Sequence, residues 1–151
     1  MIGAIIAKKK VRSAFDSLSQ QDLDAFLANW AEGATLVYPS PTGPSFPTSI
    51  PVIEGKEAIR EWYQRFIEEW EVTSFTLKNI CVQRLCPIVF GTNVVTVEWD
   101  LKVITKGGAK ESDTSGVTVI TLKKGKATEV RVYECAGDPI WRVMGPEKDT
   151  A

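Results

Sequence analysis

Apolar residues in the first half of the chain recur at three- and four-residue spacings, and this spacing predicts helices. The first helix is expected from about Ile5 to Leu18, with one apolar face formed by Ile5, Ile6, Val11, Ala14, Phe15 and Leu18. A second, short helix is expected to start near Asp22, whose carboxylate can cap it, and to end at Gly33. Its buried side would carry Leu23, Phe26, Leu27 and Trp30. A third helix is expected from about Lys56 to Trp70, with Ile59, Trp62, Tyr63, Phe66, Ile67 and Trp70 facing one way.

After Glu71 the pattern changes to the alternation and β-branched composition of strands. Four segments have this character, and turn-like breaks separate them: "TSFTLKNICVQ", "NVVTVEWDLKVIT", "SGVTVITLKK" and "ATEVRVYEC". The glycines of "KGGAK" and "KGK" suit tight hairpins, and "ATLVY" earlier in the chain is a short strand-like run. The pattern predicts an α+β domain, in which three N-terminal helices pack against one face of a curved antiparallel sheet.

Alternation also predicts which side chains face the helices. In the long strand, Val95, Val97, Trp99, Leu101 and Val103 share the inner face, and Thr96, Glu98, Asp100 and Lys102 share the outer face. In the last strand, Val130 and Val132 share a face with Glu134, opposite Arg131, Tyr133 and Cys135. A carboxylate at the end of an apolar row either sits at the rim in water or has a raised pKa.

Length and charge narrow the class of protein. At 151 residues the chain is one domain long, with a core at about 5–136 and a C-terminal tail at 137–151. Its 18 basic and 19 acidic residues form no long run of one sign, so neither nucleic acid nor a membrane is an expected partner. The N-terminal "MIGAIIAKKK" has the reverse order of a secretory signal, and its apolar run is too short to span a bilayer. We therefore expect a cytoplasmic protein.

Side-chain chemistry limits the reactions that are open to the chain. It has no histidine, and its three cysteines, Cys81, Cys86 and Cys135, lack metal-ligand spacing. No dinucleotide, P-loop, hydrolase-elbow or zincin motif occurs. We expect no metal and no cofactor, so any catalysis would use carboxylates, tyrosine, cysteine or lysine.

Three stretches together resemble the NTF2-like superfamily, in its SnoaL-like and ketosteroid-isomerase-like branch. They are "VRSAFDSLSQQDLDAFLANWAEGATLVYP", "IEGKEAIREWYQRF" and "SGVTVITLKKGKATEVRVYE", and the resemblance spans about residues 5 to 136. It implies a cone of curved sheet closed by helices, a deep apolar pocket inside the cone and frequent dimerisation. The branch contains isomerases, cyclases, dehydratases, epoxide hydrolases and ligand binders, so the fold alone does not name the activity.

The positions that ketosteroid isomerases use for catalysis are occupied differently in this chain. Ala14 stands where the resemblance places an oxyanion-donating tyrosine, and Thr118 stands where it places a second, acidic donor. The base of those enzymes is an aspartate before a proline, whereas this chain has Tyr38 before Pro39. A phenol is a poor base at neutral pH but a good hydrogen-bond donor. Steroid isomerisation by that machinery is therefore not expected.

Limonene-epoxide-hydrolase-like enzymes provide a second comparison. Their Arg-x-Asp corresponds most nearly to Glu98, Trp99 and Asp100, and Val132 occupies the position of their last aspartate. Only Asp100 is retained, and the alternation places it on the outer face unless a bulge turns the strand.

The expected site thus has few polar groups in an apolar pocket. Tyr38, Glu134 and Asp100 are the candidate catalytic residues. The candidate ligand-binding residues are Trp30, Trp62, Phe66, Phe75, Trp99, Thr118 and Val132. The aromatic ones would stack on a flat or polycyclic ligand. The segment "LVYPSPTGPSFPTSIPVIEG" at 36–55, with five prolines, is expected to be a stiff flap across the pocket mouth.

Three functions remain open from the sequence. The protein could bind a small hydrophobic terpenoid, steroid or polyketide-like molecule and act on it by acid and base chemistry, as an isomerase, cyclase, dehydratase or hydrolase. Tyr38 would then donate a hydrogen bond to a ligand oxygen while Glu134 moves the proton. It could instead bind or carry such a ligand without catalysis, or be a dimerisation or adaptor domain with a filled core. The polar outer face of the sheet suits either simple exposure to solvent or a sheet-to-sheet contact, and the expected assembly is a homodimer through the sheet.

Overall fold

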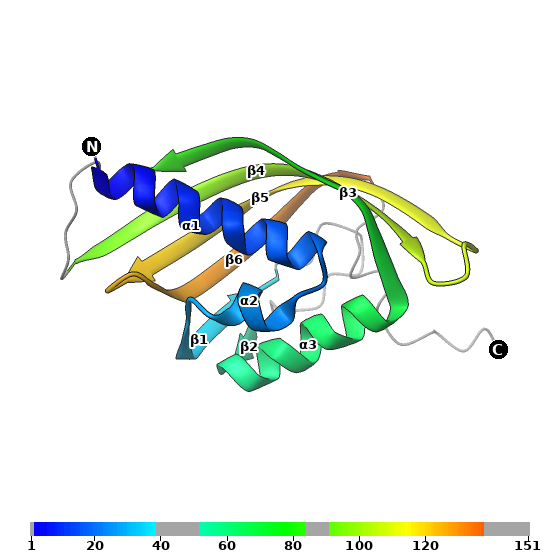
Figure 1. Ribbon diagram of the computed structural model, residues 1–151, viewed down its shortest axis with the longest axis horizontal. Coiled ribbons are helices and arrows are strands. Elements are labelled where there is room, and N and C mark those ends of the chain that lie inside the picture. The colour runs from blue at the N-terminus through cyan, green and yellow to red at the C-terminus, as the bar shows by residue number, and fades with distance from the viewer. Residues whose placement is uncertain (1, 39–51, 84–90, 138–151) are drawn as a thin grey trace, which may run out of the picture.

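The computed structural model describes residues 2–38, 52–83 and 91–137, which form three helices and six strands (Figure 1). Their order is α1 (Ile2–Ser19), α2 (Leu23–Leu27), β1 (Trp30–Val37), β2 (Val52–Glu54), α3 (Lys56–Glu69), β3 (Trp70–Val82), β4 (Thr92–Thr105), β5 (Glu111–Lys123) and β6 (Lys126–Gly137). The strands form one sheet in the order β2-β1-β6-β5-β4-β3. The α+β class is confirmed. Residues 39–51 of the expected flap, the tail beyond Gly137 and Cys86 lie outside the described residues, whereas the two ends of the flap segment form the end of β1 and β2.

The sheet is mixed, and the expectation of a wholly antiparallel sheet is wrong at one pair of strands. β3, β4, β5 and β6 form an antiparallel meander, whereas β1 runs parallel to β6, with Val37 opposite Arg131. Alternation of side chains shows which face of a strand is buried but carries no information about the direction of its partner. A hairpin fixes that direction for neighbours in sequence, and no hairpin joins β1 to β6.

Two of the expected helix ends are also wrong. α2 ends at Leu27, so Trp30 and Gly33 belong to β1, and α3 ends at Glu69, so Trp70 opens β3. Both tryptophans keep their burial in the strand, where aromatic residues are favoured. The cap at Asp22 is confirmed, because the Ala25 amide donates to its Oδ1 at 3.0 Å. Of the three described helices only α1 and α3 are long, and α3 follows two strands.

The buried faces follow the sequence pattern closely on the sheet and less closely on α1. Val95, Val97, Trp99, Leu101 and Val103 are all buried. On α1, Ala4, Ala7, Val11 and Phe15 are buried, whereas Ile5 and Ile6 are 63% and 50% exposed. Because Ala4 and Ala7 lie on the same helical stripe as Val11, the two isoleucines fall outside it.

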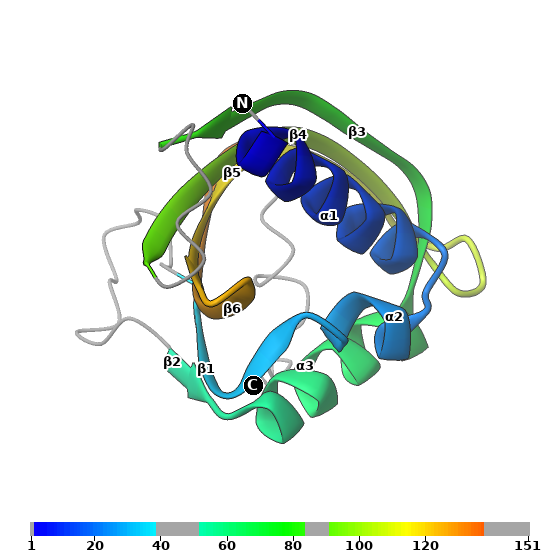
Figure 2. The ribbon, with the colours of Figure 1, turned by 60° about the vertical axis from the view of Figure 1, so that its left-hand side comes forward.

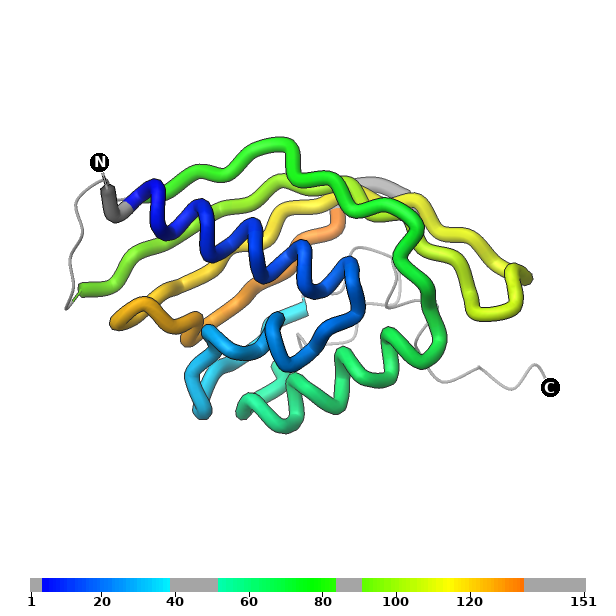
Figure 3. Tube along the Cα trace, viewed as in Figure 1, coloured from blue at the N-terminus to red at the C-terminus, as the bar shows by residue number. Residues whose placement is uncertain are grey.

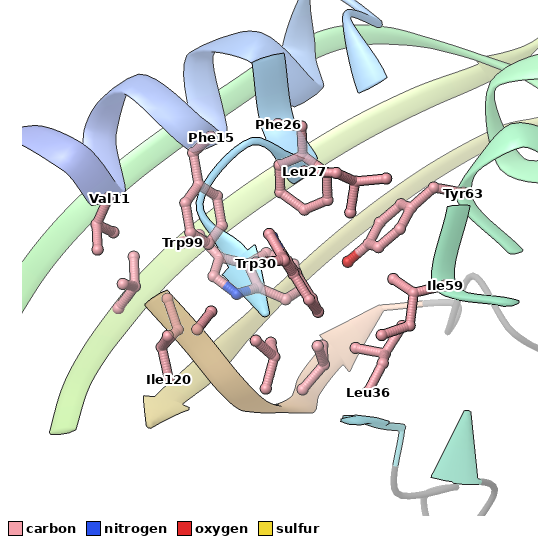
Figure 4. Close-up of a cluster of buried hydrophobic side chains, with 14 of the residues drawn as sticks. Val11, Phe15, Phe26, Leu27, Trp30, Leu36, Ile59, Tyr63, Trp99 and Ile120 are labelled. Carbon is pink, nitrogen blue, oxygen red and sulfur yellow. The ribbon is translucent and has the colours of Figure 1, made fainter. Parts of the chain in front are cut away.

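Register shifts bend the sheet around its helical side. β3 has an unpaired residue between Val72 and Ser74 and another between Leu77 and Asn79, and β6 is shifted against β5 at two points. Bulges of this kind increase the local twist of a strand. Figure 2 shows the result: the sheet curves from β3 round to β1 and β2, with α1, α2 and α3 on its concave side. Side chains from all three helices and from the sheet converge there (Figure 4).

Two kinds of structural feature are absent from the described residues. None of the described helices is both long enough and apolar enough to cross a membrane. The described residues contain no group of three or more histidine, cysteine, aspartate or glutamate side chains that could hold a metal ion.

Candidate functional site

A pocket lies between the three helices and the concave face of the sheet. Its cavity volume is about 110 Å³, whereas a cavity for one water needs about 10–15 Å³. The pocket therefore has room for a ligand larger than a few waters. Its lining comes from every described helix and from all strands except β2: Lys10, Val11, Ala14, Phe15, Leu18, Phe26, Asn29, Trp30, Tyr38, Trp62, Tyr63, Phe66, Val72, Phe75, Trp99, Leu101, Thr118, Ile120, Leu122, Gly125, Ala127, Val130 and Val132.

Two chains of touching aromatic rings form much of the lining. One chain runs Tyr38, Trp62, Tyr63, Phe26 and Trp30, with ring centroids between 4.8 and 5.6 Å apart. The other runs Phe15, Phe75 and Trp99, with centroids 5.2 and 5.9 Å apart. Figure 4 shows Phe15, Phe26, Trp30, Tyr63 and Trp99 gathered from different elements. Such flat, apolar surfaces suit a flat ligand, because offset and edge-on ring contacts add to the burial of apolar area.

Tyr38 and Glu134 form a hydrogen bond at the wall of this pocket. The Tyr38 hydroxyl donates to Glu134 Oε1 at 2.6 Å, a short distance typical of a carboxylate acceptor. The parallel pairing of β1 and β6 brings them together: Val37, at the end of β1, pairs with Arg131 in the middle of β6, so Tyr38 lies close to the following residues of β6. Tyr38 is buried and Glu134 is half-buried. The two candidate catalytic residues are therefore in direct contact, and the role expected for Tyr38 toward a ligand oxygen stays a prediction.

The surroundings keep the Tyr38 phenol protonated. Burial raises the pKa of Tyr38 well above its ordinary value of 10, and the negative charge and hydrogen bond of Glu134 raise it further. Burial also raises the pKa of Tyr63. The phenol of Tyr38 is thus the donor of the pair, and a free tyrosinate is strongly disfavoured.

Thr118 and Gly116 fix the position of Trp99. The Trp99 indole Nε1 donates to Thr118 Oγ1 at 2.9 Å in the buried interior. Gly116 lies directly opposite Trp99 in the sheet, and a Cβ at residue 116 would lie 2.5 Å from Trp99 Cζ2 and 2.5 Å from the Tyr133 carbonyl oxygen. The indole therefore packs directly against the backbone of Gly116, and the Thr118 hydroxyl already accepts a hydrogen bond from it.

The structure brings most of the sequence-predicted residues to this pocket. Tyr38 and all seven candidate ligand-binding residues line it, and Glu134 stands behind Tyr38. Asp100 is not brought to the pocket: its carboxylate is on the outer face and pairs with Lys78 at 2.8 Å. The bulge between Leu77 and Asn79 is in β3, so β4 keeps its alternation through Asp100.

Sequence reasoning missed Lys10 and Asn29, which also line the pocket. The signal for Lys10 was its spacing, three residues after Ala7 and four before Ala14, which puts it at the border of the buried stripe of α1. Asn29 follows the end of α2, and the overlong helix predicted there concealed that it lies in a connection.

Comparison with known proteins agrees with this architecture. A ketosteroid isomerase-like protein from Erwinia carotovora atroseptica superposes with a TM-score of 0.67 at 12% identity, covering 87% of this chain and 95% of that one. A "putative SnoaL-like polyketide cyclase" from Jannaschia superposes with a TM-score of 0.64 at 18% identity, covering 91% of this chain and 88% of that one. A "putative isomerase" from Bacillus subtilis superposes with a TM-score of 0.64 at 21% identity, covering 85% of this chain and 86% of that one. At these identities the likeness shows the fold alone.

The family follows from the sequence match. No functionally curated protein matches the chain significantly. Residues 11–130, however, match the SnoaL-like domain as a family, and this range contains α2, α3, β1 to β5 and nearly all of the pocket lining. The chain belongs to the SnoaL-like domain family.

Proposed function

We propose that the pocket binds a flat, largely apolar small molecule and that Tyr38 and Glu134 together move a proton to or from it without a cofactor. The observation that carries the proposal is the 2.6 Å hydrogen bond from Tyr38 to Glu134 at the wall of an otherwise apolar, aromatic pocket. A carboxylate in hydrogen-bond contact with a pocket-lining hydroxyl has the arrangement that general base catalysis requires.

The pair would work as a relay. The Tyr38 oxygen accepts a proton from an acidic C–H or O–H of the ligand while its own proton passes to Glu134. The ligand then carries the negative charge that Glu134 has lost, and Glu134 is a neutral acid. Because the pKa of Tyr38 is raised, the two transfers have to be coupled, without a free tyrosinate between them. Returning the proton to another atom of the ligand completes an isomerisation. In a cyclisation the carbanion attacks a carbonyl carbon within the ligand, a C–C bond replaces the C=O π bond, and the resulting alkoxide oxygen takes the proton back from Glu134 through Tyr38.

Deuterium exchange tests this function before the natural substrate is known. β-Tetralone is a flat apolar ketone whose acidic C–H protons lie next to its carbonyl, and proton NMR in D2O follows their loss. We expect the wild-type protein to accelerate the exchange. Tyr38→Phe and Glu134→Gln should each lower the catalysed rate by about 10²-fold or more, the usual size of a general base contribution.

Glu129→Gln and Tyr133→Phe are matched controls on the same strand. Glu129 pairs with Arg131, and Tyr133 is 41% exposed; neither lines the pocket. Both variants should exchange at the wild-type rate. The proposal fails if the protein binds β-tetralone without accelerating exchange, or if both site variants keep the full rate.

A non-catalytic carrier is the second candidate, and the apolar lining favours it. Within the described lining, Thr118 is already bonded to Trp99, which leaves few polar groups to bind or activate a substrate. A carrier would bind the ketone with similar affinity in the wild type and in Glu134→Gln and would show no exchange. The third candidate, a dimerisation domain with a filled core, is disfavoured by the pocket itself.

A further inference from the structure

One end of the pocket is lined by exposed residues of α1 and of the turn between β5 and β6. Lys10, Asn29 and Gly125 all line the pocket there, and all three are exposed. The Lys10 ammonium lies over the turn, with Nζ 3.8 Å from the place that a Cβ on Gly125 would take. Figure 3 shows this turn at the end of the molecule where α1 begins. The pocket is therefore open to solvent beside a lysine, at a place distant in sequence from Tyr38.

The charge at this mouth is positive. Lys10 is the one charged side chain among the described residues that line the pocket. The turn adds Lys123, Lys124 and Lys126, which are exposed, and we call these four residues the lysine collar. Within the part of the chain that the structure describes, no member of the collar takes part in an ion pair. The collar is locally cationic although the whole chain has a net charge of −1.

We propose that the ligand of this pocket is an amphipathic anion, whose apolar ring system lies among the aromatic side chains and whose carboxylate or similar anionic group stays at the lysine collar. This inference rests on the proposed binding of a small molecule in the pocket, but not on the proposed proton transfer. Burying a charge in the apolar interior is costly, so an anionic group would remain at the exposed mouth. Clustered charge of one sign there also attracts an oppositely charged ligand from solution.

The geometry separates the two ends of such a ligand. Lys10 approaches Gly125 at the mouth, whereas Tyr38 contacts Trp62 and Glu134 at another part of the lining. An anion held at the collar would place the apolar body toward the aromatic residues. The anionic group would then set the orientation of the ligand, and it would not itself contact the relay pair.

A matched pair of probes tests the inference. Naphthaleneacetate and naphthaleneethanol share a flat ring system and differ in charge, and calorimetry at low salt measures the affinity of each. We expect the carboxylate to bind about two- to fivefold more tightly than the alcohol, the effect of one exposed ion pair. Salt should remove the preference, because charges are screened over about 10 Å at 0.1 M. Lys10→Gln should abolish it, so that the variant binds the carboxylate no more tightly than the alcohol.

Lys9→Gln is the control, since it removes the same charge from an exposed position of α1 that does not line the pocket. It should keep the preference for the carboxylate. Equal binding of the two probes to the wild type overturns the inference and leaves the proposed pocket binding standing. Binding of neither probe contradicts both. If Lys10→Gln weakens binding to phosphatidylserine vesicles but not the preference between the probes, the collar serves a lipid surface and the inference is wrong.

Discussion

At the scale of single residues, the proposed chemistry depends on two side chains that are 96 positions apart in sequence. Both Tyr38 and Glu134 could be named from the sequence, one from its place before a proline and the other from its place at the end of an apolar row. Their contact could not, because it depends on the parallel pairing of β1 with β6. The hydrogen bond from Tyr38 to Glu134 follows from that pairing and could not be read from the sequence, and the role expected for Tyr38 toward a ligand oxygen stays a prediction.

The raised pKa of Tyr38 has a consequence for stability at high pH. The folded protein holds a phenol proton that the unfolded chain releases above about pH 10. The contribution of this proton to the free energy of unfolding is therefore complete below pH 10. It is lost at about 1.4 kcal/mol per pH unit as the pH rises toward the pKa of Tyr38 in the folded protein. We expect the free energy of unfolding of the wild type, measured by urea denaturation, to fall relative to that of Tyr38→Phe above pH 10. Parallel pH profiles for the two proteins would contradict the assignment.

At the scale of elements, the sheet was predicted better than the helices. Two-residue alternation identified the inner face of β4 residue by residue, and the glycines of both predicted hairpins have the positive φ that tight turns need, 113° and 73° at Gly107 and Gly108 and 75° at Gly125. The predicted ends of the second and third helices, at Gly33 and Trp70, were misplaced. The reason is that buried aromatic residues such as Trp30 and Trp70 satisfy a helical and a strand pattern equally well over a short window.

Gly116 makes a sharp test of how β5 supports the pocket. A Cβ at this position would overlap the Trp99 ring and the Tyr133 carbonyl oxygen, and a carbonyl held in the sheet ladder cannot easily move. We expect Gly116→Ala to lower the free energy of unfolding by about 1–3 kcal/mol, the usual cost of overpacking. Chemical denaturation measures the change.

Gly33→Ala is the matched control, because Gly33 is also in a strand and no atom lies within 4 Å of its Cβ position. It should be neutral or stabilising by up to about 1 kcal/mol. Equal changes in the free energy of unfolding for the two substitutions would show that the packing of Trp99 does not require a glycine at position 116.

At the scale of the whole molecule, the outer face of the sheet is the surface that we expect to pair two copies of the chain. It carries the ion pairs of Lys78 with Asp100 and of Lys102 with Asp113, each at 2.8 Å. Beside them Val117 pairs with Tyr133 across β5 and β6, and Tyr133 is 41% exposed. An exposed aromatic residue among satisfied charges is typical of an interface with a polar rim.

Sedimentation velocity over a range of concentrations tests this expectation. The wild type should form a homodimer, and Tyr133→Lys should shift it toward the monomer by placing like charges across a two-fold axis. Ile5→Lys, which adds the same charge to an exposed apolar position on α1, should leave the homodimer unchanged. A wild type that stays monomeric at all concentrations would contradict the expected homodimer.

The central claim is that Tyr38 and Glu134 form one proton-transferring unit, and the exchange rate of the double variant tests it most directly. Groups that act as a unit show strongly non-additive losses. We predict that Tyr38→Phe/Glu134→Gln exchanges deuterium into β-tetralone no more slowly than the slower of the two single variants. If the losses of the single variants multiply in the double variant, the two residues act independently and the relay is wrong.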